Sequence, residues 1–187
     1  MVIELEADAP GGHERDSGMS ADYHLVSYWR VRGELEEVAA ILREPRDLVR
    51  WWPEVYLDVE VQGEGGADGV GKVVGVHSRG RLPYTLRWFF EVVESRWPHG
   101  ATIEAWGDLA GRGSWSLIQD GIDVQATYDW RVRAQKPLLR LLSPLLKPVF
   151  AWNHRWAMAK GEAGLRREIA HRRKLREEGS PGAPRPG

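Results

Sequence analysis

Short segments of alternating apolar and polar residues fill the middle of the sequence, between Val55 and Val132. Turn-forming residues divide this region into six segments, at positions 63–71, 80–83, 98–100, 111 and 120–121. Alternation with a period of two places apolar side chains on one face of a strand, and closely spaced segments of this kind indicate an antiparallel meander. Residues 24–32 alternate in the same way ahead of the six. The sequence therefore predicts a curved antiparallel sheet of seven strands.

Each predicted strand has one strongly apolar face, which we expect to point inward. The residues on these faces are Leu25, Ser27, Trp29 and Val31; Val55, Leu57, Val59 and Val61; Tyr84, Leu86, Trp88, Phe90 and Val92; Ile103, Ala105 and Leu109; Trp115 and Leu117; and Val124, Ala126, Tyr128, Trp130 and Val132. On the opposite faces, Arg87, Glu104 and Asp129 are expected to form solvated cross-strand pairs.

Three other stretches have helical periodicity. In residues 34–43 the apolar side chains recur at i, i+3, i+4 and i+7, which is the stripe of an amphipathic helix. Pro45 can begin a second short helix, which Pro53 ends. After Pro137 a long helix is predicted to run to about Arg176, with one stripe formed by Val149, Trp152, Asn153, Trp156 and Ala163. Gly161 and Gly164 within it predict a close approach to the sheet. Strand, two helices, six strands and a long helix make an α+β order.

The two ends of the chain have compositions that do not favour packing. We expect residues 1–20 to be a flexible N-terminal extension, residues 21–176 the folded domain, and residues 177–187, rich in Pro and Gly, a disordered tail. The start of the protein is either Met1 or Met19. Residues 165–176 are strongly basic, yet no aromatic residues interleave the charges. That pattern favours the solvated end of a helix over a nucleic-acid site, with peripheral contact to an anionic membrane as the weaker alternative.

The composition restricts where the protein works and which chemistry it can perform. The sequence has no cysteine, which excludes disulfides and thiolate sites and favours a reducing compartment, so we expect a cytoplasmic protein. The first residues have no apolar core of a secretory signal, and no run of about 20 apolar residues would cross a membrane. The six histidines have no metal-binding spacing, and there is no G-x-S-x-G serine motif. We expect neither a metal nor another cofactor.

Residues 66–73, GADGVGKV, fit part of a phosphate-binding pattern. A phosphate loop needs a Ser or Thr after the lysine and a helix beyond it. Here Val73 follows Lys72, and the next residues read as a strand. The glycines are therefore predicted to form a hairpin connection.

The sequence contains the motifs WWPEV (51–55), ADGVGK (67–72), GRLPY (80–84), GRGSWSL (111–117) and YDWRV (128–132) with the following KPLL. Together these motifs resemble those of the START-like, helix-grip superfamily, also called SRPBCC, of polyketide cyclases, lipid-transfer domains and coenzyme Q-binding proteins. The resemblance covers about residues 22–165. It implies a sheet wrapped around the last helix, two short helices closing one end, and an elongated cavity for an apolar ligand.

Ten tryptophans are many for 187 residues, and several lie on predicted inward faces. Such side chains suit a cavity for an aromatic or lipid-like molecule, although they can also simply fill a core. The predicted ligand-binding residues are Trp29, Tyr84, Trp88, Phe90, Trp115, Tyr128, Trp130, Asn153 and Trp156, with either Trp152 or Trp156 facing inward from the helix.

Two functions remain open at this point. The first is binding, with or without transport, of a hydrophobic small molecule such as a lipid, a quinone or a polyketide. The second is a polyketide cyclase or dehydratase that uses general acid and base groups, for which Tyr128, His154 and Tyr84 are candidates. Asn153 and His154 are adjacent, about 100° apart around a helix, so at most one is expected to point straight into the cavity. Binding is favoured because the apolar signal is stronger than any acid and base pair.

Overall fold

The computed structural model describes residues 22–134 and 143–178, and its main element is a seven-stranded antiparallel sheet. The strands are β1 (Asp22–Arg32), β2 (Tyr56–Gly63), β3 (Val73–Arg79), β4 (Thr85–Ser95), β5 (Gly100–Gly107), β6 (Leu109–Asp120) and β7 (Asp123–Ala134). Their order is β1-β7-β6-β5-β4-β3-β2, so β2 to β7 form a meander and β1 pairs with β7. The predicted sheet is confirmed.

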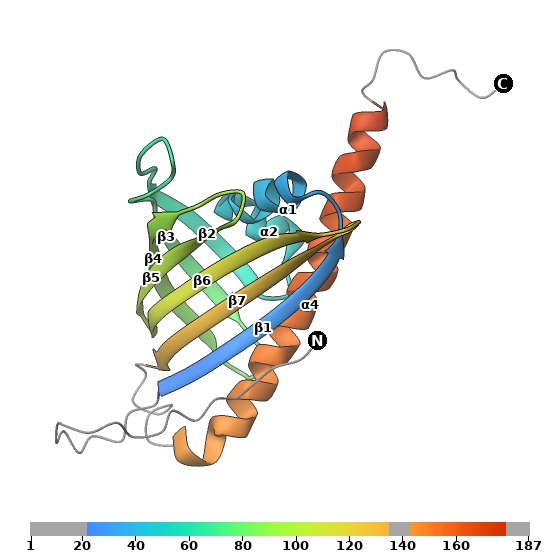
Figure 1. Ribbon diagram of the computed structural model, residues 1–187. Coiled ribbons are helices and arrows are strands. Elements are labelled where there is room, and N and C mark those ends of the chain that lie inside the picture. The colour runs from blue at the N-terminus through green and yellow to red at the C-terminus, as the bar shows by residue number, and fades with distance from the viewer. Residues whose placement is uncertain (1–21, 135–142, 179–187) are drawn as a thin grey trace.

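Four helical elements complete the described fold. α1 (Leu35–Leu42), the 3-10 helix η1 (Pro45–Asp47) and α2 (Leu48–Trp51) follow β1, and α4 (Ser143–Glu178) follows β7. Figure 1 shows the sheet curving around α4, with α1 and α2 at one end of the curve. Pro45 begins η1, and the Glu44 side chain accepts a hydrogen bond from the backbone N–H of Arg46, which caps this start. This is the predicted α+β helix-grip arrangement.

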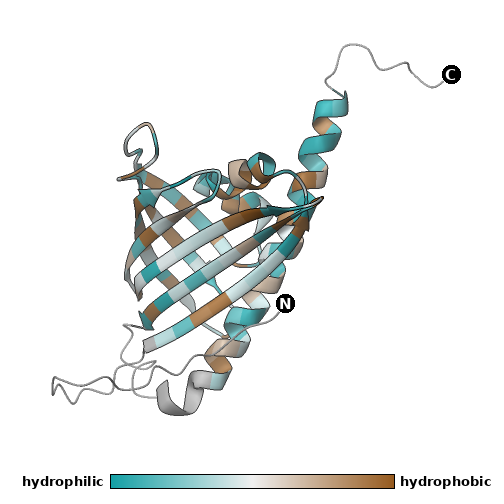
Figure 2. Cartoon of the chain, in the orientation of Figure 1, coloured by the Kyte–Doolittle hydropathy of each residue, from teal (hydrophilic) through white to brown (hydrophobic). Residues whose placement is uncertain are grey.

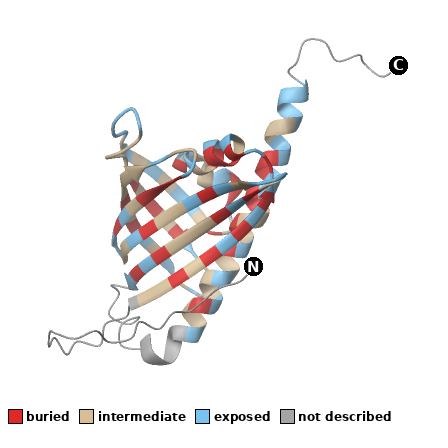
Figure 3. Ribbon diagram, in the orientation of Figure 1, coloured by how far each residue is buried: buried red, intermediate tan, exposed pale blue. Residues whose placement is uncertain are grey.

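The buried hydrophobic side chains form two clusters, and Figure 3 shows buried positions along the strands, the short helices and α4. The first joins α1, α2 and α4 to β1, β6 and β7, and includes Trp29, Val38 and Leu165. The second lies within the curve of the sheet and includes Trp88 and Trp130. Tyr56 and Tyr128, both partly buried, pack against both clusters. These two tyrosines therefore lie where the clusters meet.

The buried face of α4 differs from the predicted stripe. Ala151, Met158, Leu165 and Ile169 are buried and follow one another at intervals of seven, seven and four residues, which places them on one side of the helix, whereas Trp152 is 40% exposed. Trp152, one of the two rings predicted as alternatives for the inward position, is therefore not on the buried side of α4. Gly161 and Gly164 do permit a close approach, but to Trp52 and Trp51 rather than to the sheet.

Two predictions for the strands were also wrong. A β-bulge interrupts the pairing of β2 with β3 between Tyr56 and Asp58. An extra residue in one strand reverses which side chains point inward, so Leu57 is 39% exposed and Tyr56 lines the inside instead. Gly111 does not form the turn that was predicted there. It lies within β6, paired with Val132, and β5 and β6 are instead separated by Asp108.

Ion pairs attach the basic end of α4 to the short helices. Glu37 of α1 contacts Arg173, at 2.6 Å, and Arg176. Glu168, with a side chain 4% exposed, binds Arg172 at 2.6 Å and also Arg50 of α2. Figure 2 shows this end of α4 to be largely hydrophilic. The basic residues of this segment thus serve contacts within the domain.

Parts of three predictions fall outside the described residues. They are the N-terminal extension (1–20), most of the C-terminal tail (177–187) and the KPLL motif after β7. Within the described residues, none of the helices has the length and apolar character needed to span a membrane.

Candidate functional site

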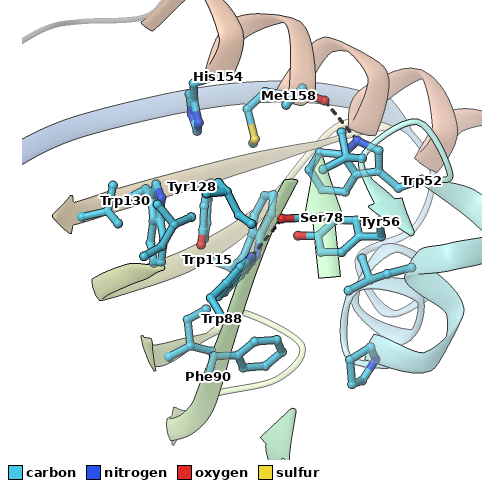
Figure 4. A pocket seen from close by; sticks show the side chains of 18 of the residues that line it. Trp52, Tyr56, Ser78, Trp88, Phe90, Trp115, Tyr128, Trp130, His154 and Met158 are labelled. Carbon is cyan, nitrogen blue, oxygen red and sulfur yellow. Dashed lines mark hydrogen bonds between the residues drawn. The ribbon is translucent and has the colours of Figure 1, made fainter. Parts of the chain in front are cut away.

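A cavity of about 260 Å³ lies between the inner face of the sheet, α2 and α4. Strands β3, β4, β5, β6 and β7 supply much of its wall, and Trp52 and Met158 close it from the side of the helices. Figure 4 shows these side chains around the space. The cavity therefore occupies the position that the fold resemblance predicts.

A row of aromatic rings runs along one wall. The ring centroids of Trp115 and Tyr128 are 4.5 Å apart, and those of Tyr128 and Trp130 are 5.8 Å apart, with both pairs stacked. Trp130 then meets Trp88 at 6.0 Å, and Trp88 meets Phe90 at 5.9 Å. Stacked and tilted rings at such distances attract one another beyond their burial of area. The row presents a continuous apolar wall with fixed ring positions.

Small residues make room for this row. Gly113 of β6 pairs with Trp130, and a Cβ at position 113 would lie 2.7 Å from Cε3 of the Trp130 ring and 2.4 Å from the hydroxyl oxygen of Tyr128. Real Cβ atoms do not come so close to other heavy atoms, so a larger residue would displace the rings. Glycine at position 113 of β6 therefore leaves the space that the rings of Tyr128 and Trp130 occupy.

Only a few polar groups interrupt the apolar wall. The indole Nε1 of Trp88 donates a hydrogen bond of 3.0 Å to the Ser78 hydroxyl. The hydroxyls of Tyr56 and Tyr128 also face the space, and burial raises the pKa of both well above the usual range for tyrosine. These hydroxyls are therefore neutral at physiological pH, and apolar walls with a few polar groups are typical of small-molecule sites.

His154 lines the cavity from α4 and is held from behind by β1. Its Nε2 shares a hydrogen bond of 3.0 Å with the hydroxyl of Ser27, which is fully buried. Burial lowers the pKa of His154 to about 4. The imidazole is therefore neutral at pH 7, and the same burial makes it a weaker base than an exposed histidine.

The loop between β3 and β4 covers one edge of the cavity and is tied to α4. Asn153 Oδ1 accepts a hydrogen bond of 2.7 Å from the backbone N–H of Arg81, whose guanidinium lies 5.1 Å from the ring centroid of Trp152. Gly80 is required next to Asn153, because a Cβ there would lie 2.1 Å from Oδ1. Beside this loop, burial and the nearby Tyr23 raise the pKa of Tyr84 to about 12.

The charged residues along the cavity wall are all basic. Arg43, Lys72 and Arg79 belong to the lining, together with the neutral His154. No aspartate or glutamate is found among the lining residues in the described part of the chain. The cavity therefore offers hydrogen-bond donors and positive charge, with no carboxylate to bind a cation.

The structure brings most of the predicted site residues together. Among the residues that line the cavity are Tyr84, Trp88, Phe90, Trp115, Tyr128, Trp130, Asn153 and His154. Asn153 borders it at the β3–β4 loop, where its Oδ1 binds the backbone of Arg81. Trp29 and Trp156 are not in the lining. Trp29 is 2% exposed and packs between Trp52 and Trp115, with centroid distances of 5.5 Å and 5.0 Å. Trp156 packs against the first core cluster.

The sequence reasoning missed Tyr56 and Ser78. Tyr56 was hidden by the bulge at the start of β2, which no turn residue marks. Ser78 ends the buried face of β3, where the pattern Val74, Val76, Ser78 continues the alternation. That alternation was a usable signal for Ser78.

No protein-family model and no curated protein matches the sequence. Solved structures do share its fold. The Zhui aromatase/cyclase from Streptomyces sp. R1128 is 14% identical, with a TM-score of 0.64, over 85% of this chain and 99% of that one. A START superfamily protein from Mycobacterium smegmatis is 12% identical, with a TM-score of 0.62, over 79% and 97%. A norcoclaurine synthase mutant from Thalictrum flavum, in complex with a transition-state analogue, is 13% identical, with a TM-score of 0.55, over 82% and 98%.

Proposed function

Because the chain has the START-like helix-grip fold around an aromatic cavity, we propose that it binds a hydrophobic small molecule in that cavity. The observation that carries the proposal is the row of stacked and tilted rings from Trp115 to Phe90 along the wall of the cavity. Rings that merely filled a core would leave few voids larger than a water molecule. The fold alone does not define the function, so the proposal depends on this wall.

The size of the cavity favours a compact ligand. A volume of about 260 Å³ is close to the lower end of the range of about 300–1,000 Å³ for small-molecule sites. A quinone ring or a short folded polyketide suits this volume better than a long acyl chain. The absence of a carboxylate from the described lining further favours a neutral or anionic molecule over an amine.

A second function, cyclisation or dehydration of a polyketide-like substrate, is supported by the presence of His154, Tyr128 and Tyr84 in the lining of the same cavity. In this proposal His154 accepts a proton from a carbon next to a carbonyl, and Tyr128 donates a hydrogen bond to the carbonyl oxygen. Tyr84, at the rim, is the third candidate. If Tyr128→Phe or His154→Ala abolishes turnover of a bound compound without abolishing binding, the protein is an enzyme.

The first test is native mass spectrometry of freshly purified protein, followed by denaturing extraction and identification of any released compound. We expect a retained apolar molecule. The matched variants are Ala101→Leu, which adds bulk to the cavity wall, and Ala159→Leu, which adds the same bulk on the exposed face of α4. The retained mass should be lost only in Ala101→Leu. An empty wild-type protein that also fails to bind a panel of apolar probes would contradict the proposal.

A further inference from the structure

Two tyrosine hydroxyls face the cavity without a hydrogen-bond partner among residues 22–134 and 143–178 (Figure 4). They belong to Tyr56 at the start of β2 and Tyr128 in β7, and both residues line the space. Burial raises the pKa of both, and the nearby Tyr56 raises that of Tyr128 further. Each hydroxyl therefore keeps a proton that it can donate to a bound molecule.

The position of the Tyr128 hydroxyl is fixed by its neighbours. Its ring stacks between those of Trp115 and Trp130, so it cannot turn freely. The hydroxyl oxygen lies over Gly113, where a Cβ would come within 2.4 Å. Because glycine has no side chain, β6 leaves room at position 113 for this hydroxyl.

The position of Tyr56 depends on the bulge at the start of β2. Regular alternation would turn Leu57 inward and Tyr56 outward, and the register shift between Tyr56 and Asp58 reverses this. Bulges of this kind often re-aim a side chain next to a functional site. The Tyr56 ring then packs edge-on against Trp52, with a centroid distance of 5.2 Å. The bulge therefore places the hydroxyl-bearing Tyr56, instead of the apolar Leu57, at the boundary of the two core clusters.

The chemistry of the wall determines what these hydroxyls can bind. Ser78 already accepts a hydrogen bond from Trp88, so its own hydroxyl proton is also available to a ligand. With no carboxylate in the described lining, the available groups are mainly donors, and they require an acceptor. The row of stacked rings beside them favours a flat framework.

We propose that Tyr56 and Tyr128 orient the ligand by donating hydrogen bonds to an oxygen acceptor, and that the ligand is a flat, carbonyl-bearing molecule. This inference rests on the proposed ligand-binding function of the same cavity. It assigns to Tyr56 a role in ligand binding that the sequence pattern did not suggest. The β2 bulge contributes by turning Tyr56 toward the cavity.

The test uses two probes of almost the same shape, fluorene and 9-fluorenone, which differ by one carbonyl group. Affinities are measured from the quenching of tryptophan fluorescence in the full-length protein. We expect the wild-type protein to bind 9-fluorenone about 10-fold more tightly than fluorene, the ratio for one or two net hydrogen bonds. Tyr56→Phe and Tyr128→Phe should each remove about 3-fold or more of this preference, and neither should weaken fluorene binding. Tyr28→Phe makes the same change on the exposed outer face and should have no effect.

Infrared spectroscopy distinguishes a direct hydrogen bond to the probe carbonyl from a change in cavity shape caused by the substitutions. The carbonyl stretch of bound 9-fluorenone should lie at a lower wavenumber than in hexane, and should move back in the double variant Tyr56→Phe, Tyr128→Phe. Thermal unfolding of each variant without probe checks that the fold is intact. If both probes bind wild type equally and the variants change neither affinity, the inference is wrong while the binding function stands. If neither probe binds the wild-type protein, the inference fails, and native mass spectrometry with the wider panel of apolar probes decides the binding function.

Discussion

Gly164 of α4 lies directly against the backbone carbonyl oxygen of Trp51 in α2: a Cβ at position 164 would be 2.0 Å from that oxygen. One turn earlier, a Cβ on Gly161 would lie 2.4 Å from Cζ2 of Trp52. The two helices therefore touch through positions that have no side chain on α4. This contact holds the stacked pair of Trp51 and Trp52, and Trp52 closes the cavity from the side of the helices.

Gly164→Ala is expected to destabilise the protein in spite of the better helix propensity of alanine. Alanine at an unobstructed helix position gains about 1 kcal/mol over glycine. Here the added methyl group meets backbone that cannot rotate away, and overpacking of this kind costs about 1–3 kcal/mol beyond that gain. Urea unfolding measures the difference. Ala170→Gly on the exposed face serves as the control for propensity alone, and a stabilised Gly164→Ala would show that the helices are further apart.

Glu37→Gln is expected to loosen the basic end of α4. Burial by itself would raise the pKa of Glu37, but hydrogen bonds and charge from Arg173 and Arg176 outweigh it and lower the pKa. Because both arginines are partly exposed, the expected loss is only about 1 kcal/mol, and it should shrink in 1 M salt. Glu36→Gln removes the same charge from the exposed side of α1. Equal effects of the two variants would mean that the ion pairs contribute nothing specific.

Vesicles rich in anionic lipid are expected not to retain the protein at physiological salt. The arginines of the basic segment, namely Arg166, Arg167, Arg172, Arg173 and Arg176, each have a carboxylate partner within 4 Å. Attraction of a segment to a membrane depends on charge that is not already neutralised. Co-sedimentation measures retention, with neutral vesicles as the control. Retention by the anionic vesicles alone would show that the segment contacts membranes.

The sequence predicted the strands well because alternation in a half-buried sheet is a local property. The inward positions of Trp88, Phe90, Tyr128 and Trp130 follow from the period of two. Alternation predicts the face of the sheet on which a side chain lies, but not what that side chain contacts. Trp29 points inward like these residues, yet it packs against Trp52 and Trp115 and does not line the cavity. Whether an inward ring lines the cavity or packs against another ring depends on the curvature of the sheet, which cannot be predicted from a local sequence pattern.

The predictions that were wrong concern features that depend on contacts between distant segments or on irregular backbone. The β2 bulge changes the face of Tyr56 without any glycine or proline beside it. In α4, Gly161 and Gly164 correctly indicated close packing, yet their partners belong to a helix more than 100 residues earlier. Trp152 has an apolar body but lies over Arg81 at the surface, where its ring contacts a cation. Composition alone cannot distinguish such a ring from a buried one.

Acidification is expected to destabilise the protein through His154 before the carboxylates contribute. Burial lowers the pKa of His154 from 6.5 to about 4, so between these pH values the unfolded chain binds a proton that the folded protein does not. Stability therefore rises with pH in this window, and about 3 kcal/mol should be lost on going from pH 6.5 to pH 4. Glu37 and Glu168, whose pKa values are lowered in the fold, lose their contributions below pH 4.5.

The pH dependence is measured by urea unfolding between pH 4 and pH 8 in the wild-type protein and in His154→Gln. Glutamine can keep a hydrogen bond to Ser27 but does not titrate, so the slope between pH 4.5 and 6.5 should flatten. His171→Gln, on the exposed side of α4, is the control and should keep the wild-type slope. An unchanged slope in His154→Gln would show that this histidine is not buried as a neutral group.

Gly113→Ala is expected to disturb the aromatic row, and the disturbance should depend on the Tyr128 hydroxyl. The new methyl group would meet that oxygen at 2.4 Å and the Trp130 ring at 2.7 Å. A rigid stack can relieve such contacts only by moving several rings, so we expect a loss of about 1–3 kcal/mol, a changed near-ultraviolet circular dichroism spectrum and weaker binding of 9-fluorenone. In a Tyr128→Phe background the oxygen is absent, and Gly113→Ala should cost less. Residues in contact couple in this way, whereas independent sites add. Strict additivity of the two changes would place the hydroxyl away from Gly113 and remove the argument that β6 makes room for it.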